Sequence, residues 1–93
     1  MTKNWTFLSH HAHILIALDK DPDSKIEDLA EILGVTPRSV VNVLNDLVDG
    51  GYLTKSKLGR RNHYQISKDA YLRHATSAQK RVGDLIQSLG QFR

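Results

Sequence analysis

Three histidines stand within four positions near the N-terminus, in the stretch SHHAHILIAL over residues 9–18. Imidazole side chains bind metal ions and change charge near neutral pH. His10 and His13 are three residues apart, so on a helix they share one face, as two metal ligands do. A closed site needs further ligands, and His74 is the nearest candidate because the sequence has no cysteine. We therefore expect no metal or other cofactor, with His10, His13 and His74 as the alternative metal site.

His11 is predicted to face the protein core. It lies three and four positions before Ile14 and Leu15, on the side of the helix that carries these apolar residues. A partly buried neutral imidazole is common at such a position. Ser9 is a good N-cap, which places the histidines in the first turn of the helix. We expect the cluster to line an effector pocket or a pH-sensitive interface where this helix meets the C-terminal helix.

The composition is that of a single small globular domain of 93 residues. The chain has no apolar stretch of about 20 residues, which a membrane helix needs, and no signal-peptide pattern, so we expect a cytoplasmic protein without a membrane partner. Charge is unevenly distributed. Six acids against two lysines leave residues 19–35 at −4, whereas residues 36–63 carry five cations against two acids, or +3. One basic and one acidic face are typical of a protein that docks on phosphates.

Three helices are predicted before residue 50. The first covers residues 10–20 and is apolar on more than one side, which indicates partners on two sides. The stretch DPDSKIEDLAEILG, residues 21–34, predicts a second helix with Ser24 and Glu27 as a capping box and Gly34 as its left-handed cap. In the third helix, residues 37–49, Thr36 is the expected N-cap. A short turn between two such helices is typical of a helix-turn-helix.

The remaining chain predicts a hairpin and one more helix. Residues 52–67 alternate as strands do, with Gly59 near the turn. Residues 69–89 are predicted to form a helix with an apolar seam that runs for about 27 Å. Its apolar side chains follow a heptad pattern: Tyr71, Ala75, Ala78, Val82, Leu85 and Leu89.

Residues 29–66, LAEILGVTPRSVVNVLNDLVDGGYLTKSKLGRRNHYQI, resemble the winged helix-turn-helix transcriptional regulators of bacteria and archaea, broadly the MarR-like group. Within them, DLVDGGYL is similar to the stretch that closes the recognition helix of that group, and GRRNHY is similar to its wing. The opening WTFLSHHAHIL also resembles the start of some short regulators of the group. The implied fold is mainly α with a small β-hairpin (α+β). Residues 1–67 form the winged helix-turn-helix, and residues 68–93 form a C-terminal dimerisation helix in the same compact unit.

This resemblance implies a regulator that binds double-stranded DNA, with recognition helix 37–49 in the major groove and wing 55–63 on the backbone or minor groove. With Val40, Val43, Leu44 and Leu47 inward, the exposed side chains suit base edges, and Arg38 and Asn42 are the expected base readers. Thr36 and Ser39 are expected to hold phosphate. The predicted DNA-binding residues are Thr36, Pro37, Arg38, Ser39, Val41, Asn42, Asn45, Lys55, Lys57, Arg60, Arg61 and Asn62.

A homodimer is expected, and with it a pseudo-palindromic site whose half-sites lie about 10 base pairs apart or a multiple of that. The predicted dimer contacts are the heptad side chains together with two aromatic residues: Trp5, Phe7, Tyr71, Ala75, Ala78, Val82, Leu85 and Leu89. In the alternative, the last helix folds back on the first helix of its own chain, because a heptad pattern does not distinguish the two arrangements.

The sequence contains no arrangement of nucleophile and base that would indicate an enzyme. The alternative to DNA binding is a winged helix that binds protein or RNA. A small-molecule effector is compatible with the sequence, which does not identify one.

Zinc or nickel added to the purified protein tests the metal alternative. We expect neither the melting temperature nor DNA affinity to change, because two histidines without further ligands do not complete a site. A rise in melting temperature with metal that the double variant H10A/H13A no longer shows would contradict this expectation.

Overall fold

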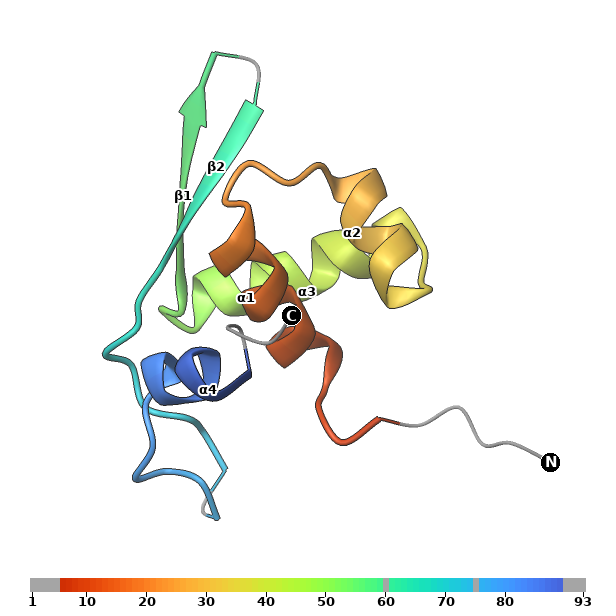
Figure 1. Ribbon diagram of the computed structural model, residues 1–93. Coiled ribbons are helices and arrows are strands. Elements are labelled where there is room, and N and C mark those ends of the chain that lie inside the picture. The colour runs from red at the N-terminus through yellow and green to blue at the C-terminus, as the bar shows by residue number, and fades with distance from the viewer. Residues whose placement is uncertain (1–5, 60, 75, 90–93) are drawn as a thin grey trace, which may run out of the picture.

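The computed structural model describes residues 6–59, 61–74 and 76–89, with Leu58 and Arg61 described by their backbone only. Four helices and one antiparallel hairpin occur in these residues (Figure 1). In chain order they are α1 (His10–Lys20), α2 (Ile26–Leu33), α3 (Pro37–Asp49), β1 (Leu53–Leu58), β2 (Arg61–Ile66) and α4 (Val82–Leu89). The predicted class, mainly α with a small hairpin, is confirmed.

Helix α1 is the centre of the core. It contacts α2, α3, α4 and β2, which confirms that its apolar surface has partners on more than one side. Ile14 and Leu18 are fully buried, as are Leu29 of α2 and Val40 of α3. The wing, formed by β1 and β2, projects from one side of this core, and α4 packs on another (Figure 1). No helix in the described ranges is both long and apolar enough to cross a bilayer.

The turn between α2 and α3 follows the sequence prediction. Gly34 adopts a left-handed conformation with φ of 71°, where a side chain would be strained, and its N–H bonds to the carbonyls of the last turn of α2. The Val35 N–H also bonds to the Ala30 carbonyl at 3.0 Å. Thr36 caps α3, because its Oγ1 accepts the Ser39 N–H at 3.1 Å. These contacts fix the angle between the two helices.

The predicted capping box at Ser24 is wrong. The N-cap of α2 is Lys25, which makes no side-chain cap bond. Ser24 instead donates its hydroxyl to the Asp21 carbonyl at 2.8 Å, and Asp21 Oδ1 accepts the Asp23 N–H at 3.1 Å. Short polar side chains compete for backbone groups in turns, so Ser24 closes the turn after α1 and does not start α2.

The hairpin has a continuous register, from Leu53 opposite Ile66 to Leu58 opposite Arg61. Gly59 lies in its turn with φ of 65°, as two-residue hairpin turns require. Leu53 and Tyr64 are buried in the core, which fixes the face that the hairpin turns inward.

The predicted helix over residues 69–89 is wrong in its first half. Within the predicted range only Val82–Leu89 are helical. The described residues between Ser67 and Val82 form turns, bends and an antiparallel bridge between Tyr71 and Arg81. Ser77 directs both its N–H and its hydroxyl to the His74 carbonyl, and Thr76 bonds to the His74 ring. These local bonds compete with helical ones, so the heptad pattern does not form a long seam.

The short α4 packs inside its own chain, as in the alternative weighed above. Val82 has no exposed surface, Ile86 is buried, and α4 contacts α1. Val82, a predicted dimer contact, is therefore a core residue of this structure.

Two leucine-sized side chains of α2 test this core. We expect Leu29→Ala, at a fully buried position, to lower the free energy of unfolding by about 2–5 kcal/mol, because it removes buried methyl groups and leaves a cavity. The matched control is Ile32→Ala on the same helix, where the side chain is 69% exposed. This variant should change the free energy of unfolding by less than about 0.5 kcal/mol. Equal effects of the two variants in urea unfolding would contradict the observed packing of α2.

Candidate nucleic-acid interface

One face of α3 is exposed along its length. The opposite face is held inward because Val40, Val43, Leu44 and Leu47 are buried. All six side chains that the helical period predicts outward are exposed: Pro37, Arg38, Val41, Asn42, Asn45 and Asp49. This face offers a guanidinium, two amides and a small apolar group, which are the groups that read base edges in a major groove.

The N-terminus of α3 is polar and open. Thr36 is exposed and Ser39 half-buried, and their hydroxyl oxygens lie 3.1 Å apart. Thr36 satisfies one amide of the first turn, at Ser39. Pro37 has no N–H, and the Val40 N–H bonds to the Thr36 carbonyl at 3.2 Å. The Arg38 N–H is therefore the remaining first-turn amide suited to a phosphate.

A groove separates α3 from the wing. Arg38 and Asn42 line it on the helix side, and Asn62 and Tyr64 line it on the β2 side. The Asn62 Oδ1 atom is buried in the described structure without a hydrogen-bond partner. Burial raises the pKa of Tyr64, and a hydrogen bond from the Asn62 side chain acts in the opposite direction. Asn62 thus holds a buried acceptor without a partner at the groove that Arg38 and Asn42 also line.

The wing carries basic side chains next to this groove. Lys55 and Lys57 are exposed on β1 and pair in register with Tyr64 and Asn62. Cross-strand partners in register share a face of a hairpin, so both lysines lie on the face that borders the groove. Of the other predicted wing residues, Arg60 lies outside the described residues, and Arg61 is placed by its backbone alone.

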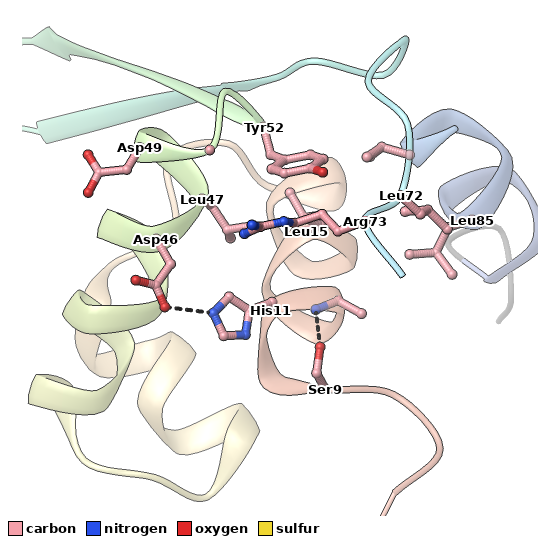
Figure 2. Close-up of a pocket in the computed structure, with 13 residues that line it drawn as sticks. Ser9, His11, Leu15, Asp46, Leu47, Asp49, Tyr52, Leu72, Arg73 and Leu85 are labelled. Atoms are coloured by element: carbon pink, nitrogen blue, oxygen red, sulfur yellow. Dashed lines mark hydrogen bonds and ion pairs between the residues drawn. The ribbon is translucent and has the colours of Figure 1, made fainter. Parts of the chain in front are cut away.

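His11 is half-buried and pairs with a side chain of α3. Its Nε2 is 2.9 Å from Asp46 Oδ2 of α3, and both side chains are partly exposed (Figure 2). The pair lines a cavity of about 690 Å³ between α1, the end of α3 and the C-terminal segment. Leu15 and Leu47 supply an apolar wall, and Arg73 reaches into the same space (Figure 2). The sequence did not indicate Asp46, because 35 residues separate it from His11.

The three histidines of the alternative metal site, His10, His13 and His74, are not gathered into one site. His10 and His13 line a groove between α1 and α2, where His13 Nε2 is buried without a hydrogen-bond partner among the described residues. His74 lies in the C-terminal turns and bonds to Thr76. Within the described ranges, no three histidine, aspartate or glutamate side chains are placed to hold a metal ion.

The predicted dimer contacts are scattered. Phe7 is 93% exposed, and Tyr71, Ala78 and Leu89 are also exposed. Leu85 is half-buried and lines the cavity beside His11. Trp5 and Ala75 lie outside the described residues.

A sequence profile of the MarR family matches residues 6–61 of this chain. Among solved structures, the chain is similar to AdcR, a zinc-dependent MarR family transcriptional regulator in its Zn(II)-bound state, with 28% identity and a TM-score of 0.54 over 71% of this chain and 47% of AdcR. It is also similar to Lactococcus lactis ZitR, a zinc-responsive MarR family member, with 23% identity and a TM-score of 0.54 over 71% of this chain and 47% of ZitR.

ZitR in complex with DNA matches over more of the chain, with a TM-score of 0.59 and 22% identity over 98% of this chain and 66% of ZitR. The chain thus spans about half to two thirds of the length of these relatives. None of the curated proteins matches it.

Proposed function

This chain belongs to the MarR family, and from that premise we propose that it is a transcriptional regulator that binds double-stranded DNA through α3 and the wing and performs no catalysis. The observation that carries the proposal is the exposed polar face of α3 beside a wing with exposed lysines. A protein of the same fold, ZitR, has been solved in complex with DNA, which supports the same class of partner here. Such a protein acts where DNA is accessible, in the cytoplasm.

In the proposed complex, α3 lies in the major groove. Arg38 and Asn42 read bases, because guanidinium and amide groups can bond two base atoms at once and both side chains border the groove beside the wing. Phosphates are held at the N-terminus of α3 by Thr36 and Ser39. The remaining contacts are those predicted from the sequence: Pro37, Val41, Asn45 and Asn62 near the bases, and Lys55, Lys57, Arg60 and Arg61 on the backbone or in the minor groove.

We further propose that the regulator binds as a homodimer to a pseudo-palindromic site. Residues 1–67 provide the DNA-binding part, and the C-terminal part, residues 68–93, provides the dimer contacts. The exposed side chains of Tyr71 and Leu89 support a surface that a second copy can cover. This surface replaces the long heptad seam, since that helix does not form.

The cavity beside His11 supports an effector site in the same proposal. Its volume falls in the range of small-molecule pockets, and it combines leucine side chains with a few charged groups. It lies against the C-terminal end of α3, so an occupant can bias the position of the recognition helix.

The wing is tested by charge reversal. A duplex is first selected from a random library with the purified protein. R60E/R61E is then compared with K20E, a charge reversal on the exposed last residue of α1, outside α3, the wing and the C-terminal part. We expect R60E/R61E to weaken binding at least tenfold and to reduce the salt slope by about 1–2, because phosphate contacts are lost. K20E should have a much smaller effect for each charge reversed. No enriched duplex, or equal effects of the two variants, would contradict the proposal.

The dimer is tested by sedimentation velocity at tens of micromolar protein. We expect a species of twice the chain mass that shifts toward monomer in L89E, because a charge on an exposed apolar contact opposes association. A monomer at all concentrations, free or bound to the selected duplex, would contradict the homodimer.

A further inference from the structure

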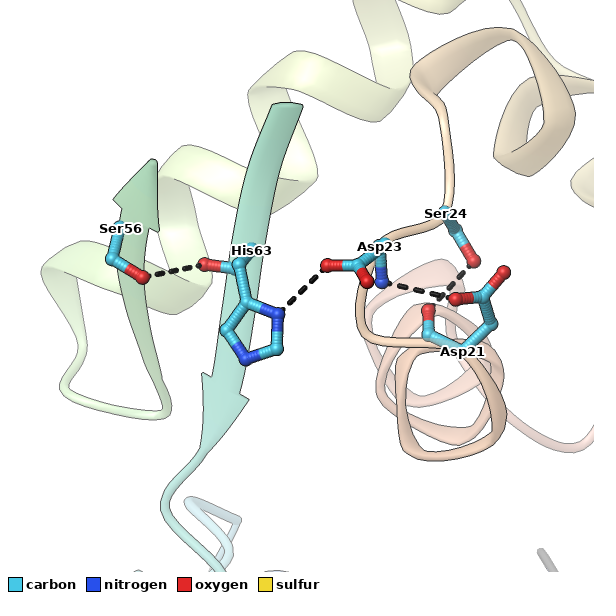
Figure 3. Close-up of polar contacts among 5 residues, drawn as sticks. All are labelled: Asp21, Asp23, Ser24, Ser56 and His63. Atoms are coloured by element: carbon cyan, nitrogen blue, oxygen red, sulfur yellow. Dashed lines mark hydrogen bonds and ion pairs between the residues drawn. The ribbon is translucent and has the colours of Figure 1, made fainter. Parts of the chain in front are cut away.

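The root of the wing is attached to the turn between α1 and α2. The Tyr64 N–H of β2 donates to the Pro22 carbonyl at 3.1 Å, on the edge of β2 that faces away from β1. Next to this bond, the His63 Nδ1 atom lies 2.7 Å from Asp23 Oδ1 (Figure 3). A carboxylate only accepts hydrogen bonds, so Nδ1 is the donor. One backbone bond and one side-chain bond thus join segments 40 residues apart.

The turn that provides Asp23 is itself well fixed. Asp21 Oδ1 accepts the Asp23 N–H, and the Asp21 carbonyl accepts both the N–H and the hydroxyl of Ser24 (Figure 3). On the wing side, Ser56 of β1 donates its hydroxyl to the His63 carbonyl at 3.5 Å. Asp23 and His63 are 40% and 35% exposed, so the pair is partly shielded from water. Their contact is the one described side-chain bond between this turn and the wing.

An isolated two-stranded hairpin has little stability of its own, so its direction depends on what its root contacts. Lys55 and Lys57 sit opposite Tyr64 and Asn62, and a movement of β2 therefore displaces both lysines relative to α3. We infer that Asp23 and His63 are positioning residues, which hold the basic wing at the angle to α3 that DNA requires. Asp23 lies at the groove between α3 and the wing, where a negative charge by itself disfavours DNA. This inference rests on the proposed function.

Because Asp23 is negatively charged, a charge effect and a positioning effect predict opposite changes in DNA affinity when its carboxylate is removed. Removing a carboxylate makes a DNA-binding protein more positive, and on charge alone this strengthens binding to a polyanion. Loss of a positioning contact has the opposite effect. Asp28 is a matched control, because it is an exposed acid on the neighbouring helix α2, on the groove that faces α1.

The experiment compares D23A, D23N and D28A for affinity to the selected duplex. We expect D23A to weaken binding about fivefold and to reduce the salt slope by about 1, as for a lost phosphate contact. D28A should bind as well as the wild type or more tightly. D23N keeps an oxygen acceptor for His63 and should recover most of the affinity. A D23A variant that behaves as D28A does would overturn the inference.

A second comparison shows whether Asp23 acts through the wing. In the K55Q/K57Q/R60Q/R61Q background the wing has lost all four of its proposed basic contacts, so adding D23A should change affinity by less than twofold. If D23A still weakened binding fivefold in that background, Asp23 would not act through the wing, and the inference would be overturned.

Hydrogen exchange of the free protein provides a readout that does not involve DNA. The Tyr64 amide should exchange several times faster in D23A than in the wild type, while amides of α3 keep their rates. An unchanged Tyr64 amide in D23A would overturn the inference even if the wild type binds no duplex, whereas failure of the wild type to bind any duplex would by itself contradict the proposed function only.

Discussion

The burial of one side of α3 against α1 is the constraint on which the rest of the structure depends. Val40 and Leu44 of α3 share the core with Ile14 and Leu18 of α1, and this packing fixes the rotation of α3 about its own axis. Once the rotation of α3 is fixed, the helical period of 3.6 residues determines which of its side chains are exposed. Arg38 and Asn42 face outward as a direct result, although neither takes part in the core.

Polar contacts add a second level of positioning. Two histidine and aspartate pairs join elements that are distant in sequence: His11 of α1 with Asp46 of α3, and His63 of β2 with Asp23 of the preceding turn. Both are partly exposed, so they contribute less to stability than the buried apolar side chains do. Each pair joins one element of the proposed DNA-binding face, α3 or the wing, to α1 or to the turn that follows α1.

The sequence correctly predicted those features of the fold that depend on neighbouring residues alone. Gly34, Thr36 and the apolar period of α3 are local signals, and each was confirmed in the structure. The prediction of a long C-terminal helix was wrong, since a heptad pattern carries no information on the bonds that the side chains of Thr76 and Ser77 make with His74. The contact of His63 with Asp23 could not be predicted, because it arises only when the core brings the wing beside the turn.

We propose that α3 and the wing together form one DNA-binding face. Mapping amide chemical shifts by NMR while the selected duplex is added tests this proposal most directly. We expect the largest changes in residues 36–45 and 53–64, with those of α4 nearly unchanged. Changes concentrated in α4 and around the His11 cavity, with α3 unaffected, would contradict it.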